Sequence, residues 1–140
     1  MDSFAKRYLI GLSTIVGIAV AYIVLSSDGR VDELNVMLAA DPMLRDYPYQ
    51  FRVIRLDGDV AVMGSPRSAE VPVMQFLRTA YPELSKTTVD DPAMMAAQDV
   101  LARTQVHAQD LVQGELDINT VRWELDERWF NEKGVFLPDY

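Results

Sequence analysis

An uninterrupted apolar run near the amino terminus constrains this chain more than any other feature of its sequence. Residues 8–25 contain no charged side chain, and as an α-helix they would extend about 27 Å, close to the thickness of the hydrocarbon core of a bilayer. A helix of this length in a soluble core would need a polar stripe. The polar side chains inside the run, Ser13 and Thr14, can instead bond to their own helix backbone. The run therefore predicts a single transmembrane helix.

A cleaved signal peptide is the alternative to a retained anchor. The tripeptide Ala19-Val20-Ala21 resembles the small-residue site at which signals are cut. It lies inside the apolar run, however, and the bulky residues YIVL follow it. The apolar region of a signal usually has about 7 to 15 residues and ends before the cut. We therefore favour a retained anchor, which together with a short stub occupies residues 1–27.

The charges on either side of the run predict its orientation. Lys6 and Arg7 precede it, whereas Arg30 is the only basic residue among three acidic ones in the segment SSDGRVDE, residues 26–33. Basic residues are retained in the cytoplasm. The sequence thus predicts a single-pass protein of the bacterial inner membrane, with a cytoplasmic amino terminus and a periplasmic domain.

The exported part of the chain is strongly acidic. Residues 28–140 carry 20 acidic and 11 basic side chains, a net charge of −9. Phosphate backbones and anionic headgroups repel such a surface, so we expect no nucleic-acid partner and attachment to the membrane through the helix alone. The chain has no cysteine, which excludes disulfides, thiolate catalysis and cysteine metal sites but leaves the compartment open.

Breaker and turn residues divide the first part of the exported chain into short elements. Asp28-Gly29 is expected to break or bend the first helix, and a short amphipathic helix then runs to Asp41-Pro42. Alternating side chains around Asp57-Gly58 predict a β-hairpin with a tight type I′ turn. Ser68 is expected to cap a third helix that has Pro72 in its first turn.

The remaining elements follow from similar signals. The β-branched segment LSKTTVD, residues 84–90, could form a third strand. An Asp-Pro start and the stop at Gly114 bracket a helix that begins near residue 91. A last helix is expected over residues 118–131, with Ile118, Val121, Leu125 and Trp129 on its buried face. The predicted class is α+β: a transmembrane helix, an α-β-β-α-β domain over residues 28–90, and a helical extension over residues 91–140 that packs on it.

The order of elements over residues 31–90 resembles the BON domain, a small α/β module of bacterial envelope proteins. The segments LAADPML, FRVIRLDGDVAVMG and YPELSKTTV stand where that family has the end of its first helix, its two strands with a DG turn, and its last strand. Gly58 and Gly64 match two family glycines, although PEL replaces the usual PGV. The resemblance implies envelope attachment through protein or lipid contacts, and the family has no catalytic residues to carry over.

No group of residues has the spacing of a catalytic, cofactor-binding or metal-binding motif. His107 is the only imidazole in the chain, and zinc needs three or four ligands. We interpret it as a histidine on the polar face of a helix, near Asp110 and Arg103. Asp117 and Asn119 begin like a calcium loop, but Val121 and Arg122 stand where an oxygen ligand and a glycine are needed.

Pairs of opposite charge four residues apart are typical of a solvated helix face. Three such pairs are expected on the last two helices: Asp99 with Arg103, Arg122 with Asp126, and Glu124 with Arg128.

Two features could mediate interaction. Ser13, Gly17 and Ala21 repeat at four-residue spacing and would place small side chains on one face of the anchor, which lets membrane helices approach closely. Small residues are also simply common in such helices. A candidate partner surface is the aromatic edge of Trp123 and Phe130 with Phe136 in the tail, since aromatic residues are enriched at interfaces. The alternative is that these rings cover the open face of the α/β layer.

These observations predict a non-enzymatic accessory or scaffold subunit of a membrane protein complex, without a cofactor. Its partners would be the membrane and other membrane protein subunits. The alternative is a periplasmic sensor or ligand-binding module that uses a pocket between the hairpin and the helices. A ligand-binding module should have a deep cavity of mixed polarity, whereas a scaffold should have a shallow surface and an exposed apolar edge.

Overall fold

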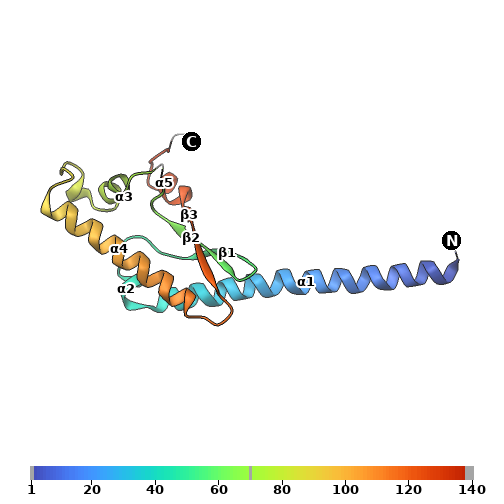
Figure 1. Ribbon diagram of the computed structural model, residues 1–140. Helices are drawn as coiled ribbons and strands as arrows, with labels where there is room; N and C mark the ends of the chain where they lie inside the picture. Colours follow the sequence, from blue (N-terminus) through green and yellow to red (C-terminus); the bar gives the residue numbers. More distant parts are fainter. Residues whose placement is uncertain (1, 70, 138–140) are drawn as a thin grey trace.

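Helix α1 (Ser3–Ala40) is continuous for 38 residues and connects the apolar run to the domain that follows it (Figure 1). The computed structural model describes residues 2–69 and 71–137. The predicted break at Asp28-Gly29 is wrong, because both residues lie inside α1. A glycine costs an exposed helix about 1 kcal/mol. Packing of the following turns offsets this cost, since Leu34 and Leu38 are fully buried.

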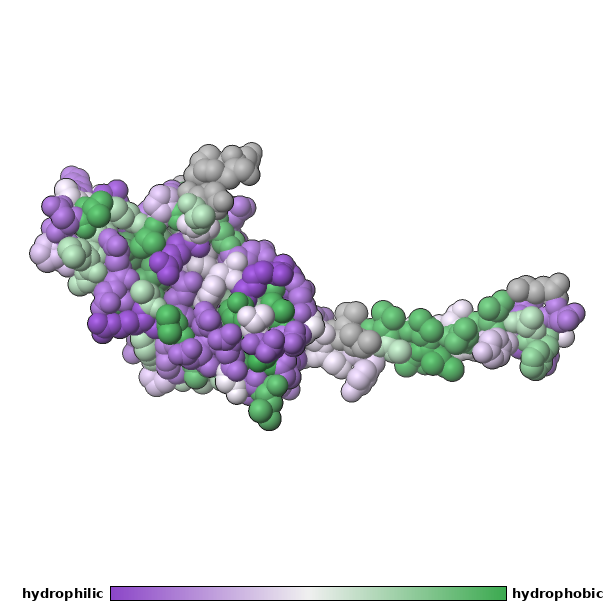
Figure 2. All heavy atoms as spheres, in the orientation of Figure 1, coloured by the Kyte–Doolittle hydropathy of each residue, from purple (hydrophilic) through white to green (hydrophobic). Residues whose placement is uncertain are grey.

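The two ends of α1 lie in different surroundings. The amino-terminal part is apolar enough and long enough to cross a membrane, and none of its apolar window is buried against the domain. A signal sequence near an amino terminus has the same properties. Figure 2 shows this part as a largely apolar rod that projects from a mostly polar domain. The carboxy-terminal part of the same helix contributes to the core of the domain.

Asp41 ends α1 and starts the next helix, α2 (Pro42–Arg45). Its Oδ1 accepts hydrogen bonds from the backbone N–H groups of Met43 and Leu44, at 3.0 and 3.2 Å. Proline at the first position of a helix lacks an N–H that would have no partner there. The predicted helix end at Asp41-Pro42 is confirmed.

The predicted β-hairpin is confirmed, with a different turn. Strands β1 (Val53–Asp57) and β2 (Val60–Ser65) pair in antiparallel register, with Asp57 opposite Val60. The two turn residues are therefore Gly58 and Asp59. Gly58 has φ of +64°, and no described residue other than glycine has positive φ. Positive φ at the first turn position alone is the pattern of a type II′ turn, so the predicted type I′ turn is wrong.

The third strand comes from a segment that we expected to be helical. Strand β3 (Thr120–Leu125) pairs in parallel with β2 and gives the sheet order β1-β2-β3. Its side chains alternate between half-buried and exposed, which is the two-residue period of a strand. The predicted helix over residues 118–131 is therefore wrong. Helix α5 (Glu127–Glu132) covers only its last part, and Asp126 caps it by accepting from the Trp129 N–H at 3.2 Å.

The strand expected over residues 84–90 does not form. This segment continues from a short 3-10 helix, η1 (Pro82–Leu84), into turns. Leu84 is its buried apolar side chain. Without an alternating apolar face, the β-branched residues Thr87, Thr88 and Val89 have no sheet to join.

The other helices agree more closely with the sequence. Helix α4 (Pro92–Gln113) begins after the cap Asp91, whose side chain accepts from the Ala93 N–H at 2.8 Å, and it ends at Gly114, as predicted. Helix α3 (Val73–Ala80) starts later than expected, with Pro72 at its N-cap. The Ser68 hydroxyl instead accepts from the Val71 N–H at 3.0 Å in the preceding turn.

One core joins elements from both predicted parts of the chain after the apolar run. Leu34 and Leu38 of α1 belong to the same buried cluster as Leu101 of α4 and Phe130 of α5. Near them, aromatic rings from four segments contact one another at centroid distances of 5.0 to 6.4 Å. Residues 28–90 and 91–137 thus share their apolar interior.

Ion pairs cover the outer side of the sheet. Arg55 on β1 contacts Asp57 at 3.6 Å and Glu124 on β3 at 2.9 Å, and Arg122 on β3 contacts Asp57 at 2.8 Å. The predicted pairs of Arg122 with Asp126 and of Glu124 with Arg128 are replaced by these cross-strand pairs because the segment is a strand. On α4, the predicted Asp99–Arg103 pair is present at 2.6 Å.

Candidate functional site

The small residues of the apolar run lie on one exposed face of α1. Ser13, Gly17 and Ala21 are exposed, and their four-residue spacing on a continuous helix aligns them. A Cβ atom at Gly17 would meet no atom within 4 Å. The Thr14 hydroxyl donates to the Ile10 carbonyl at 2.9 Å, so this polar side chain is satisfied within its own helix. This face is therefore open for contact with another helix.

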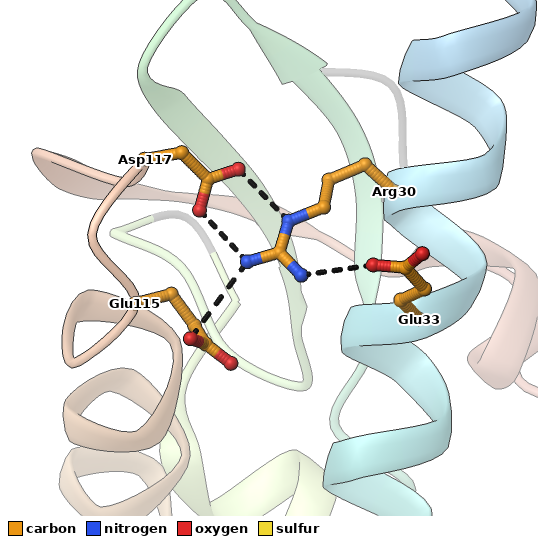
Figure 3. A network of polar contacts seen from close by, with 4 residues as sticks. All are labelled: Arg30, Glu33, Glu115 and Asp117. Carbon is orange, nitrogen blue, oxygen red and sulfur yellow. Dashed lines mark hydrogen bonds and ion pairs between the residues drawn. The ribbon is translucent and has the colours of Figure 1, made fainter.

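The junction between this helix and the domain is built around Arg30 (Figure 3). Its Nε and Nη2 donate to the two carboxylate oxygens of Asp117 at 2.8 and 2.7 Å. Nη1 donates to Glu33 at 3.1 Å, and Nη2 lies 3.8 Å from Glu115. We call Arg30 and these three carboxylates the exit clasp, because it stands five residues beyond the apolar run. It ties α1 to the loop between α4 and β3.

The Arg30–Asp117 contact of the exit clasp is a charge-assisted, bidentate hydrogen bond, which is stronger than a hydrogen bond between neutral groups. A planar guanidinium that meets both oxygens of one carboxylate has a fixed orientation as well as charge complementarity. The Arg30 side chain is about a quarter exposed, so solvent screens the pair only in part. Hydrogen bonding to Asp117 raises the pKa of Arg30, and the same contact lowers the pKa of Asp117. Three carboxylates around one cation leave the site negative.

His107 makes a second link between α1 and α4. Its Nε2 lies 2.9 Å from Oδ2 of Asp41, the residue that ends α1. The hydrogen bond to His107 lowers the pKa of Asp41. Along α1 this link is eleven residues beyond Arg30, about 16 Å in a helix. The ends of α1 and α4 therefore run antiparallel between two polar links, and the partner expected for His107 on its own helix is not the one it uses.

Asn35 attaches α1 to the sheet. Its side-chain amide donates to the Val53 carbonyl at 3.0 Å and accepts from the Val53 N–H at 2.7 Å. Both backbone polar groups of Val53, the first residue of β1, therefore have a hydrogen-bond partner on this side of the sheet. Together with the exit clasp and the His107 link, it makes the end of α1 part of the domain.

The aromatic residues that we expected to form one edge are separated. Trp123 lies on β3, where it is half-buried, donates from Nε1 to Gln109 at 3.1 Å and packs against Phe51. Phe130 on α5 has no exposed surface, whereas Phe136 in the tail is 82% exposed. Phe130 therefore packs in the core and Trp123 packs against it. The structure does not bring Trp123, Phe130 and Phe136 into one exposed surface.

A small hollow lies between the segment before β1 and α5. It measures about 220 Å³, below the roughly 300 to 1,000 Å³ of typical small-molecule sites. Its charges balance, with Arg52 and Arg128 against Asp126 and Glu132, and Arg128 already contacts Glu132 at 3.0 Å. Within residues 2–69 and 71–137, no three His, Asp or Glu side chains are grouped as metal ligands.

Comparisons with protein-family models, with curated proteins and with solved structures gave no significant match. The resemblance to the BON domain is therefore unsupported by any family model. The topology also departs from it, because the third strand comes from residues 120–125 rather than from residues 84–90. The shape and chemistry of the chain itself remain as the basis for a functional proposal.

Sequence reasoning missed the residues that join the apolar part of α1 to the domain. Arg30 and Asp117 are 87 residues apart in the chain, and no local pattern connects them. One signal was present: Arg30 is the only basic residue between Arg7 and Arg45. An isolated arginine next to a long apolar run, with acidic neighbours, indicates an ion-pair partner as well as a topology marker.

Proposed function

We propose that this chain is a single-pass inner-membrane protein whose periplasmic domain acts as an accessory or scaffold subunit of a membrane protein complex. The observation that carries the proposal is the continuity of α1, which is exposed and apolar at one end and part of the domain core at the other. A flexible tether would only localise the domain. A continuous helix also sets its height and orientation, which suits a subunit that must contact membrane partners.

Retention of the helix is supported by what cleavage would leave behind. A cut after Ala21 would expose Tyr22 and the apolar residues 23–25 at a new amino terminus. In a bilayer, by contrast, Tyr8 and Tyr22 would stand near the two interfaces, where tyrosine is enriched. Both tyrosine side chains are exposed on α1, at 65% and 72%.

A ligand-binding role has less support. The hollow between the segment before β1 and α5 is small and its charges are mutually compensated, as described above. The hollows of about 450 Å³ beside Val106 and His107 and of about 570 Å³ beside Pro72 and Val135 are larger, but both are wide open to solvent. Leu116 and Phe136 are among the most exposed large residues of the domain, and each offers a single apolar side chain to a partner.

Topology and retention are tested together by a reporter fused after Tyr140. We expect activity only from a reporter that works after export, and we expect the fusion to stay in alkali-washed membranes at its full mass. A reporter that is active only in the cytoplasm would reject the orientation. A soluble product beginning near residue 22 would reject the anchor.

The scaffold role is tested by the size of the complex in mild detergent. We expect the full chain to migrate as part of an assembly larger than its own detergent-bound monomer, and the same chain with residues 3–25 replaced by an unrelated membrane helix to lose that assembly. A full chain that migrates only as a monomer, together with saturable small-molecule binding that Arg52→Ala abolishes, would favour the ligand-binding alternative.

A further inference from the structure

Residues 26–29 are the weakest part of α1. Their sequence, Ser-Ser-Asp-Gly, combines residue types with poor helix propensity. Among the residues that the structure describes, the side chains of this segment make no hydrogen bond or ion pair, and a Cβ atom at Gly29 would meet nothing within 4 Å. Only backbone hydrogen bonds hold the helix here. The segment therefore depends on its flanking turns to stay helical.

The exit clasp begins immediately after this weak segment. Arg30 follows Gly29 directly, and its guanidinium contacts Asp117, Glu115 and Glu33. The first fully buried side chain of α1 is Leu34, one turn further along. The residue after Arg30, Val31, is only half-buried against the core, so without the clasp the firmly held part of α1 would begin later than residue 30.

We propose that the exit clasp is an orientation lock that fixes the domain about the membrane helix and limits the unsupported part of α1 to about one turn, residues 26–29, so that the helix stays straight through it. Its position supports this role, because Arg30 is the first described residue after the apolar run whose side chain makes a hydrogen bond or ion pair with a distant part of the chain. The bidentate geometry supports it as well, since two parallel hydrogen bonds to Asp117 resist rotation of α1 about its own axis. The contact sets the direction in which the domain faces.

The lock has a consequence for the chemistry of the exit point. A basic side chain beside a membrane is attracted to anionic lipid headgroups. Here three carboxylates already surround the guanidinium and leave the site negative, so it repels anionic headgroups. Arg30 is thus directed toward its own domain rather than toward the bilayer.

The absence of native cysteine allows the lock to be tested with pairs of spin labels on the full chain in nanodiscs. One pair, at Ile18→Cys and Val106→Cys, spans the clasp from the apolar run to α4. The other pair, at Val36→Cys and Val106→Cys, lies wholly on the domain side. All three positions are more than half exposed, at 66%, 56% and 69% for Ile18, Val106 and Val36.

We expect narrow distance distributions for both pairs in the otherwise unchanged protein. Arg30→Gln should broaden the distribution across the clasp about twofold and leave the domain-side pair unchanged, and Asp117→Asn should do the same. The matched control is Arg45→Gln, since Arg45 is 63% exposed and contacts only its neighbour Asp46 at 3.9 Å. This variant should keep both distributions narrow.

Three results would overturn the lock. The first is a broad distribution across the clasp before any substitution, and the second is an unchanged width in both clasp variants. The third is broadening of the domain-side pair as well, which would make the clasp a requirement of folding rather than of orientation. The lock rests on the proposed retention of α1, so intact mass is measured on each sample. A missing helix rejects the proposed anchor, whereas an intact chain with an unaltered width rejects the lock alone.

Discussion

At the scale of single residues, close packing around Gly64 shows how little space the interior leaves. A Cβ atom there would lie 2.9 Å from the Tyr49 hydroxyl and 3.6 Å from Oδ2 of Asp126. The Tyr49 hydroxyl donates to that same Asp126 oxygen at 2.9 Å. Burial, followed by the charge of Asp126, raises the pKa of Tyr49. The bare glycine therefore leaves space for a buried hydrogen bond between the segment before β1 and the cap of α5.

Gly64→Ala is expected to destabilise the domain. The added methyl group must displace the Tyr49 ring or break its hydrogen bond, and overpacking or a lost buried hydrogen bond each costs about 1 to 3 kcal/mol. Denaturant unfolding followed by tryptophan fluorescence measures this loss. Gly29→Ala is the matched control, because its methyl group meets no atom within 4 Å and alanine favours a helix. Equal stability of the two variants would contradict the packing argument.

Asp41 predicts how the domain responds to acid. Its hydrogen bond with His107 lowers its pKa below the usual value of 3.8. The unfolded chain then binds the proton more readily than the folded chain, so this contribution is present above pH 3.8 and is lost as the pH falls through the folded pKa. Asp117 contributes in the same direction through Arg30.

Asp41→Asn tests this dependence, since asparagine keeps an oxygen that can cap α2 but carries no charge. We expect the variant to be less stable than the original protein at neutral pH and to lose less stability on acidification below pH 3.8. Unfolding curves measured on either side of that pH give the two slopes. Parallel slopes would show that Asp41 does not contribute to the acid response.

At the scale of elements, local signals predicted the hairpin and α4 but not β3. Asp57, Gly58 and the alternation around them form a complete local unit, as do the cap Asp91 and the stop Gly114. In residues 118–131, Ile118, Val121 and Leu125 fit a helical face, yet Val121 and Leu125 also fit a strand with Trp123 between them. The partner of β3 is β2, which lies far earlier in the chain and pairs with it in parallel register. A parallel partner of this kind leaves no turn signal beside the strand.

The exposed face of α1 leads to a prediction about association in the membrane. Gly17→Leu adds a side chain where another backbone would approach, while it preserves hydrophobicity and insertion. We expect the protein to remain in the membrane and the larger assembly in mild detergent to be lost, with native gels and membrane fractionation as the two measurements.

Val16→Leu is the matched control for Gly17→Leu, because it adds volume about 100° around the helix. We expect it to retain the assembly. If both variants associate as well as the original protein, the small residues do not form a helix contact, and partners must be sought on the domain.

At the scale of the whole molecule, the sequence predicted the parts better than their connection. The apolar run, its flanking charges and the hairpin are all local features. The residues that join the apolar part of α1 to the domain are not, since Arg30 meets Asp117 and Asp41 meets His107 across 87 and 66 residues. The predicted break at Asp28-Gly29 is what the low helix propensity of these two residues alone would produce. It fails because tertiary contacts further along α1 outweigh propensity, as they do for most helices in proteins.

Continuity of α1 makes the direction of the domain depend on helical phase. Each alanine inserted between Ser27 and Asp28 would turn the domain by about 100° and raise it by about 1.5 Å. Two insertions turn it by about 200°, to nearly the opposite side. Four insertions add slightly more than one full helical turn, which brings the domain back close to its original direction, although they raise it twice as far as two insertions do.

A scaffold that contacts partners both in the membrane and outside it should therefore respond periodically to insertion. We expect assembly in mild detergent to be lost with two alanines and regained in part with four, despite the greater rise. A flexible tether would instead give equal assembly in both variants, and a requirement for height alone would give less assembly with four than with two. Either result would mean that α1 does not set the direction of the domain, because only a rigid helix can make the longer insertion the milder one.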